Sequence, residues 1–124
     1  MHPAGEPFDF TFDDPDLSDG SRLRRAFTDS FGWLGDATAD AELVLSELYA
    51  NAVIHGAPPV RVRAGSADDC VQVEVDDSTT RFGDPRPDSH GLRLVAKLAR
   101  NWGVRTSPLG KTVWADIAAR PSAG

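Results

Sequence analysis

The sequence predicts an α+β fold in which one mixed, mostly antiparallel sheet is covered on one face by three helices. Three observations lead to this prediction. Apolar residues alternate with period two in five short segments, as they do in half-buried strands. In three other segments they recur with the period of a helix. The order is strand, two helices, two strands, loop, helix and two strands, which is typical of a sheet with its helices on one side.

The N-terminal half predicts one strand and two helices. Residues 8–12 alternate between aromatic and polar side chains, as a short strand does. Apolar residues at helical spacing over 23–34 predict a first helix, which Ser18 or Ser21 can cap. Residues 39 to about 54 predict a second and stronger helix, which ends at a glycine and a proline pair.

The C-terminal half predicts two strands at residues 60–64 and 71–77, followed by a loop at 78–90. A helix at 91–101 and a closing hairpin at 102–118 complete the chain. The loop contains Gly, Pro and no apolar period, so it is irregular. Arg61 and Arg63 share the outward parity of Glu74 and Asp76. This shared parity predicts an antiparallel pair with a charged outer face.

Length and charge narrow the class of protein. The 124 residues fit a single domain over 1–124, with loose tails at 1–7 and 121–124. The net charge of −6 argues against direct binding of nucleic acid, because phosphate neutralisation needs a basic surface. No apolar run approaches the about 20 residues of a membrane span. Because Cys70 is the single cysteine and no signal peptide is recognisable, we expect a cytoplasmic protein.

The second helix carries polar residues beside its apolar face. A helical wheel gathers its core residues on one side: Ala41, Val44, Leu45, Leu48 and Ala52. Glu47 and Asn51 lie one turn apart between two apolar bands, and Tyr49 is expected toward solvent. Since burial of unpaired polar groups is costly, the Glu47/Asn51 stripe is expected to face a cleft. The wheel leaves open that both residues merely rim the core.

Two further features stand out. Asp77 shares the inward parity of Val71, Val73 and Val75, so its carboxylate should point toward the core side of the sheet. The alternative is a strand that ends one residue earlier and leaves Asp77 in a turn. The segment Ser89-His90-Gly91 begins a helix, where free N–H groups attract phosphate. A glycine at that place is also common in ordinary turns.

Together and in this order, these segments resemble the Bergerat-fold (GHKL) ATPases, which include gyrase, histidine kinases and MutL. Residues 46–56 (SELYANAVIHG) match the N-box of that superfamily. Residues 73–78 (VEVDDS) correspond to its adenine-binding aspartate box. Residues 91–104 resemble its glycine box and the following strand, and residues 110–114 resemble its closing hairpin. The chain is similar in particular to the small anti-sigma-factor serine kinases of the RsbW and SpoIIAB type. The likeness covers residues 8 to about 118 and implies a Bergerat-type α/β sandwich.

The resemblance implies a role for each site residue. Glu47 would be the catalytic base or the group that orients the attacking hydroxyl, and Asn51 would hold Mg²⁺. Asp77 would accept a hydrogen bond from the amino group of adenine, with residues 78–90 as the ATP lid. The remaining ATP-binding residues implied are Ser89, His90, Gly91, Leu92, Arg93 and Thr112.

The resemblance also implies a function and its partners. It implies an ATP- and Mg²⁺-dependent protein serine/threonine kinase that phosphorylates a small anti-anti-sigma (STAS) partner and thereby regulates transcription. A sigma factor and a second copy of the chain are further implied partners. Where the superfamily has glycines, this chain has Ser78, Thr79 and Ser89. This departure leaves open a second hypothesis, a catalytically weak nucleotide-binding regulator that acts by binding proteins. The ATPase half of a split histidine kinase is a third, which the lack of a preceding dimerisation helix disfavours.

Overall fold

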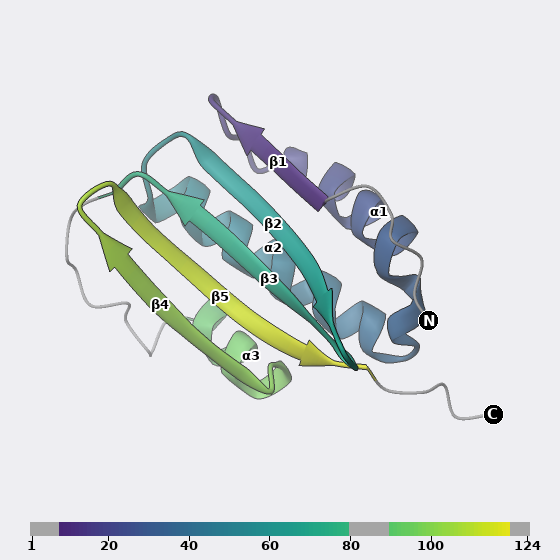
Figure 1. The fold of residues 1–124 in the computed structure, drawn as a ribbon. Helices are drawn as coiled ribbons and strands as arrows, with labels where there is room; N and C mark the ends of the chain where they lie inside the picture. The colour runs from purple at the N-terminus through teal and green to yellow at the C-terminus, as the bar shows by residue number, and fades with distance from the viewer. Residues whose placement is uncertain (1–7, 80–89, 120–124) are drawn as a thin grey trace.

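The computed structural model describes residues 8–79 and 90–119 (Figure 1). The predicted tails and most of the predicted lid, Ser89 included, lie outside these residues. The elements are, in order, β1 (Phe8–Phe12), α1 (Asp19–Phe31), the short 3-10 helix η1 (Gly32–Leu34), α2 (Ala37–His55), β2 (Val60–Ala67), β3 (Cys70–Asp77), α3 (His90–Leu98), β4 (Asn101–Ser107) and β5 (Gly110–Ala118). The predicted α+β class is confirmed.

The five described strands form one sheet in the order β1-β2-β3-β5-β4. Each neighbouring pair is antiparallel, so no parallel pair occurs within the described part, although the prediction allowed a mixed sheet. The last strand therefore lies between β3 and β4. The helices cover one face of the sheet, which we call the inner face (Figure 1). The opposite, outer face carries most of the charged side chains of the central strands, among them Arg63, Glu74 and Asp76.

The core lies between the inner face and the helices. Val62, Val73 and Val75 from the central strands are buried against Val44 and Leu48 of α2. Each such side chain contributes about 1.5–3 kcal/mol when it is fully buried. The helix α2 contacts α1 on one side and α3 on the other, and it also contacts β3 and β5. Its predicted core face is confirmed. The helix lies at the centre of the helical layer, between α1 and α3.

The outer face is an ion-pair network rather than an apolar surface. Arg63 of β2 pairs with Glu74 at 2.8 Å and with Asp76 at 2.9 Å, both on β3. Arg105 of β4 reaches Glu74 at 2.8 Å from the other side. The predicted charged outer face of the β2–β3 pair is confirmed, and the network extends it across the sheet.

One side-chain prediction is wrong. Tyr49 is buried, with 1% of its surface exposed, although the helical wheel placed it toward solvent. Its ring packs edge-on against Phe12, with centroids 5.3 Å apart. Its hydroxyl donates to Asp19 Oδ2 at 2.9 Å and lies 3.2 Å from the carbonyl oxygen of Asp16. The wheel failed because β1 and the start of α1 cover this side of α2, and a wheel contains no information about neighbouring elements.

Candidate functional site

The polar stripe of α2 lies at the border between its buried and exposed faces. Glu47 and Asn51 are both half-buried and one turn apart, so their side chains share one side of the helix. The buried Leu48 flanks them on the core side. On the other side, Leu43 and Ile54 are exposed large apolar residues. The stripe is therefore partly exposed, and the cleft beside it stays a prediction.

Asp77 is the last residue of β3, and its carboxylate points to the inner face. The side chain is 2% exposed, and it is the one buried charged residue of the described chain. The backbone N–H of Thr79 donates to its Oδ1 at 2.8 Å. The predicted inward orientation is confirmed, and the alternative of an earlier strand end is wrong. The neighbouring Asp76 instead points to the outer face, where it pairs with Arg63.

The end of β3 is in direct contact with the end of α2. Gly56 follows α2, and a Cβ atom built on it would lie 2.6 Å from Cγ of Asp77 and 2.6 Å from the carbonyl oxygen of Ala52. The N–H of Ser78 also donates to the carbonyl oxygen of Ala57 at 2.8 Å. Asp77 is thus held at the C-terminal end of the helix that carries the Glu47/Asn51 stripe.

The β4–β5 hairpin approaches Asp77 from the other side. Gly110 has φ of +150°, and a Cβ there would lie 2.1 Å from the carbonyl oxygen of Asp77. A side chain at this position would therefore force the hairpin away from β3. The next residue, Lys111, pairs with Asp77 in the sheet register. Its ammonium lies 3.8 Å from Asp77 Oδ2.

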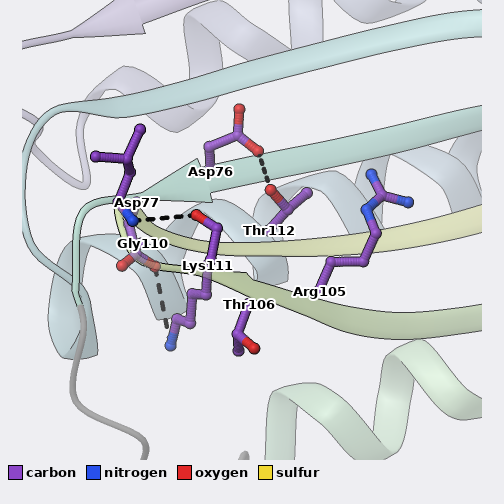
Figure 2. A pocket seen from close by; sticks show the side chains of 9 residues that line it. Asp76, Asp77, Arg105, Thr106, Gly110, Lys111 and Thr112 are labelled. Atoms are coloured by element: carbon purple, nitrogen blue, oxygen red, sulfur yellow. Dashed lines mark hydrogen bonds and ion pairs between the residues drawn. The ribbon is translucent and has the colours of Figure 1, made fainter.

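Thr112 is the predicted site residue that the structure separates from the others. It pairs with Asp76 in the sheet register, and its hydroxyl donates to Asp76 Oδ1 at 2.5 Å. Figure 2 shows Thr112 and Asp76 on the outer side of the sheet, with Lys111 on the inner side. Thr112 is therefore not part of the inner-face site. Lys111 occupies that place and was not among the predicted site residues.

A signal for Lys111 was present in the sequence. In β5, the buried residues Ala115 and Ile117 share the parity of Lys111. Continuing this alternation to the start of the strand places Lys111 on the inner face and Thr112 on the outer face. Thr112 was predicted from the resemblance to a closing hairpin, which does not depend on strand parity.

The helix α3 begins at His90, and Ser89 before it lies outside the described residues. Backbone N–H groups of the first turn of this helix, those of His90, Gly91 and Leu92, are the predicted phosphate ligands. The side chain of Leu92 is 7% exposed and belongs to the hydrophobic core, so only its backbone is suited to contact a ligand. Arg93 is exposed in the same turn. Of the predicted lid, Ser78 and Thr79 are described, together with the backbone of His90.

A hollow of about 360 Å³ lies at this end of the sheet, beside the β4–β5 turn (Figure 2). Asp77 and Lys111 line it, together with outer-face residues that include Asp76, Arg105 and Thr112. None of its lining residues belongs to α2. The hollow therefore borders the β4–β5 turn and the end of β3 and does not itself include the Glu47/Asn51 stripe.

The donor atoms suit magnesium bound through a phosphate ligand. Over residues 8–79 and 90–119, no group of three His, Cys, Asp or Glu side chains is placed to hold a metal ion. Mg²⁺ commonly keeps one or two protein oxygens and completes its coordination with water and phosphate oxygens. The amide oxygen of Asn51 is such a hard ligand.

Within residues 8–79 and 90–119, no helix is long and apolar enough to cross a membrane.

Comparisons with known proteins identify the family and the fold of this chain. A family model described as a histidine kinase-like ATPase domain matches residues 15–117. The histidine kinase domain of a blue-light activated histidine kinase from Erythrobacter litoralis is similar in structure, with a TM-score of 0.58 and 20% identity over 85% of this chain and 61% of that chain. A second structure of that kinase has a TM-score of 0.59 and 20% identity, and the match covers 85% of this chain and 42% of that chain.

These structural matches establish the fold, and the chain spans less than two thirds of the length of either matched structure. No curated protein matches the chain. The family model, in contrast, covers most of the sequence, including the α2 stripe, Asp77 and α3. This chain therefore belongs to the family of histidine kinase-like ATPase domains, within the GHKL superfamily that its motifs resemble.

Proposed function

We propose that this chain binds ATP with Mg²⁺ on the inner face of its sheet and acts as a protein serine/threonine kinase. One observation carries the proposal. The buried Asp77 carboxylate lies against the end of α2, the helix whose half-buried Glu47 and Asn51 form a polar stripe. A site of this kind can recognise a base at one end and position a phosphoryl group at the other. Membership in an ATPase family supports a nucleotide as the ligand.

At the base end, Asp77 accepts a hydrogen bond from the amino group of adenine. Its carboxylate is held in place by the N–H of Thr79 and by contact with Gly56, so it needs little reorganisation when the base arrives. A base that presents an acceptor here would leave Oδ2 of the buried carboxylate without a hydrogen-bond donor, because the N–H of Thr79 reaches only Oδ1. This penalty selects a base with an amino group.

At the phosphate end, the amide oxygen of Asn51 would hold Mg²⁺, which would supply positive charge to the phosphates when bound. Glu47, one turn earlier, accepts the proton of the attacking hydroxyl. Backbone N–H groups in the first turn of α3 face the phosphates, where the helix dipole favours negative charge. The exposed Arg93 adds a positive charge in the same turn.

The proposed phosphoryl acceptor is a serine or threonine of a small anti-anti-sigma (STAS) protein in the cytoplasm, which links the reaction to transcription. The exposed apolar residues beside the stripe, Leu43 at 41% and Ile54 at 60%, support a protein as acceptor, because they offer it a contact surface next to Glu47. A sigma factor and a second copy of the chain are further proposed partners.

A second candidate function is a nucleotide-binding regulator without efficient catalysis. The segment after Asp77 favours it. Ser78 and Thr79 stand where the superfamily has glycines, and the N–H groups of both are already bonded, to Ala57 and to Asp77. A segment held in this way has less freedom to close over a nucleotide.

Two measurements test the proposal. Isothermal titration calorimetry with and without Mg²⁺ measures ATP binding, and we expect binding that Mg²⁺ strengthens. Transfer of labelled γ-phosphate to STAS proteins encoded in the same genome measures kinase activity. Binding without transfer to any of them would favour the regulator, and absence of ATP binding would contradict both functions.

A further inference from the structure

Lys111 and Asp77 form a neighbouring pair of opposite charges on the inner face. They come from adjacent strands, β5 and β3, and face each other in the sheet register (Figure 2). The Lys111 ammonium lies 3.8 Å from Asp77 Oδ2, which is longer than a hydrogen bond. The lysine side chain is 28% exposed, whereas that of Asp77 is 2% exposed. The lysine side chain therefore extends from beside the buried carboxylate to the solvent-exposed surface.

The two groups keep hydrogen-bonding capacity for a third molecule. Asp77 uses Oδ1 to accept from the N–H of Thr79. Among the described residues, no hydrogen bond reaches Asp77 Oδ2 or the Lys111 ammonium. The site thus presents an acceptor and a charged donor side by side. Lys111 also places a positive charge beside the buried carboxylate.

The Watson–Crick edge of adenine has the complementary pattern. Its 6-amino group is a donor, and the adjacent ring nitrogen N1 is an acceptor. We propose that Lys111 is a specificity-determining residue that donates a hydrogen bond to N1 of adenine while Asp77 accepts from the 6-amino group. The inference rests on the proposed function, namely ATP binding at Asp77. It assigns the second contact of the base to a side chain to which the resemblance assigns no role.

The pair would also reject the other purine class. A 6-oxopurine presents an acceptor at position 6 and an N–H at N1, so it would bring an oxygen toward Asp77 and a donor toward Lys111. Both contacts then become repulsive, which discriminates more strongly than the loss of one attractive contact. A hydrogen bond to a charged group contributes enough to change affinity roughly tenfold or more.

The experiment compares ATP with 1-deaza-ATP, in which N1 is replaced by C–H and the 6-amino group is kept. Calorimetry in the presence of Mg²⁺ gives the Kd of both nucleotides for the wild type and for Lys111→Met, which retains the length of the apolar stem. We expect the wild type to bind 1-deaza-ATP roughly tenfold or more weakly than ATP. Lys111→Met should bind ATP correspondingly more weakly and should no longer distinguish the two nucleotides.

Lys97→Met is the matched control, because Lys97 is an exposed lysine of α3. It should leave both Kd values and their ratio unchanged. Three results would overturn the proposal: equal affinity of the wild type for both nucleotides, an unchanged ratio in Lys111→Met, or tighter ATP binding by Lys111→Met. The last would mean that Lys111 competes with the base for Asp77. In all three cases ATP still binds and the proposed function stands, whereas a wild type that binds neither nucleotide would overturn both.

Discussion

The carboxylate of Asp77 lies against the α-carbon of Gly56, with no room for a side chain between them. A Cβ on Gly56 would come within 2.7 Å of Asp77 Oδ2 and 2.6 Å of the carbonyl oxygen of Ala52. The contact joins the end of β3 to the end of α2. It therefore determines where the buried carboxylate stands relative to the helix that carries Glu47 and Asn51.

Gly56→Ala should displace the Asp77 carboxylate and weaken ATP binding by roughly tenfold or more. The added methyl group meets backbone on one side and the carboxylate on the other, so relief requires movement of Asp77 or of the helix end. Overpacking of this kind costs about 1–3 kcal/mol. Calorimetry gives the affinity and thermal unfolding gives the stability.

Gly65→Ala is the control for this substitution, since a Cβ there meets no heavy atom within 4 Å. It should change neither the ATP affinity nor the melting temperature by much. If Gly56→Ala and Gly65→Ala behave alike, the close contact with Asp77 has no functional consequence.

Asp77→Asn and Asp76→Asn should have different effects, because the two carboxylates point to opposite faces. In Asp77→Asn, an amide can turn a donor toward the adenine amino group, so ATP binding should weaken by roughly tenfold or more. Asp76→Asn should keep ATP affinity and lose part of the outer-face pairing with Arg63. Calorimetry of both variants makes the comparison. Impaired binding in Asp76→Asn alone would mean that the base-binding carboxylate is the outer one.

Glu47→Gln should separate binding from catalysis. The amide cannot accept the proton of the attacking hydroxyl, so phosphoryl transfer should fall by about 10²- to 10⁴-fold while Mg-ATP binding persists. Asn51→Ala should instead make ATP binding less dependent on Mg²⁺, because the proposed protein ligand of the ion is removed. Labelled phosphate transfer and calorimetry are the readouts. Undiminished transfer by Glu47→Gln would exclude its role as the base.

Tyr49→Phe should reduce stability without affecting ATP binding. The substitution removes the hydroxyl that joins α2 to Asp19 and to the carbonyl oxygen of Asp16. A hydrogen bond contributes about 0.5–1.5 kcal/mol, and one to a charged group such as the Asp19 carboxylate contributes about 1.5–3 kcal/mol. Urea unfolding measures the change in the free energy of unfolding. A loss of ATP affinity in this variant would place Tyr49 in the site, contrary to the fold.

The same residue gives a pH dependence. Burial, together with the hydrogen bond to Asp19, raises the pKa of Tyr49 above its ordinary value of 10.0. As pH rises past that value, the unfolded chain loses the tyrosine proton before the folded chain does. The folded state then binds more protons, so stability falls with rising pH. Since Tyr49 is the single tyrosine, tyrosinate absorbance reports its ionisation directly, and Tyr49→Phe should remove this part of the fall.

Local patterns in the sequence determined the elements and the direction of several side chains. Alternation and helical period predicted all five strands and three helices, because burial of one face imposes these periods on each segment separately. Element ends were less accurate: α2 begins at Ala37, two residues before the prediction, and α3 ends at Leu98 because β4 begins at Asn101. The inward direction of Asp77 and the partly exposed polar stripe of α2 also followed from local periodicity.

Contacts between segments far apart in the chain were decided only by the tertiary structure. Tyr49 is buried because β1 and α1 cover its side of the helix, and Lys111 faces Asp77 because β5 inserts beside β3. The close approach of Gly56 to Asp77 likewise joins two elements that are not neighbours in sequence. Period and parity are properties of one segment, whereas neighbours and register depend on how all segments pack together. For this reason the sequence alone could place the side chains of Asp77 and Lys111 on the inner face, but it could not show that they and Gly56 lie together.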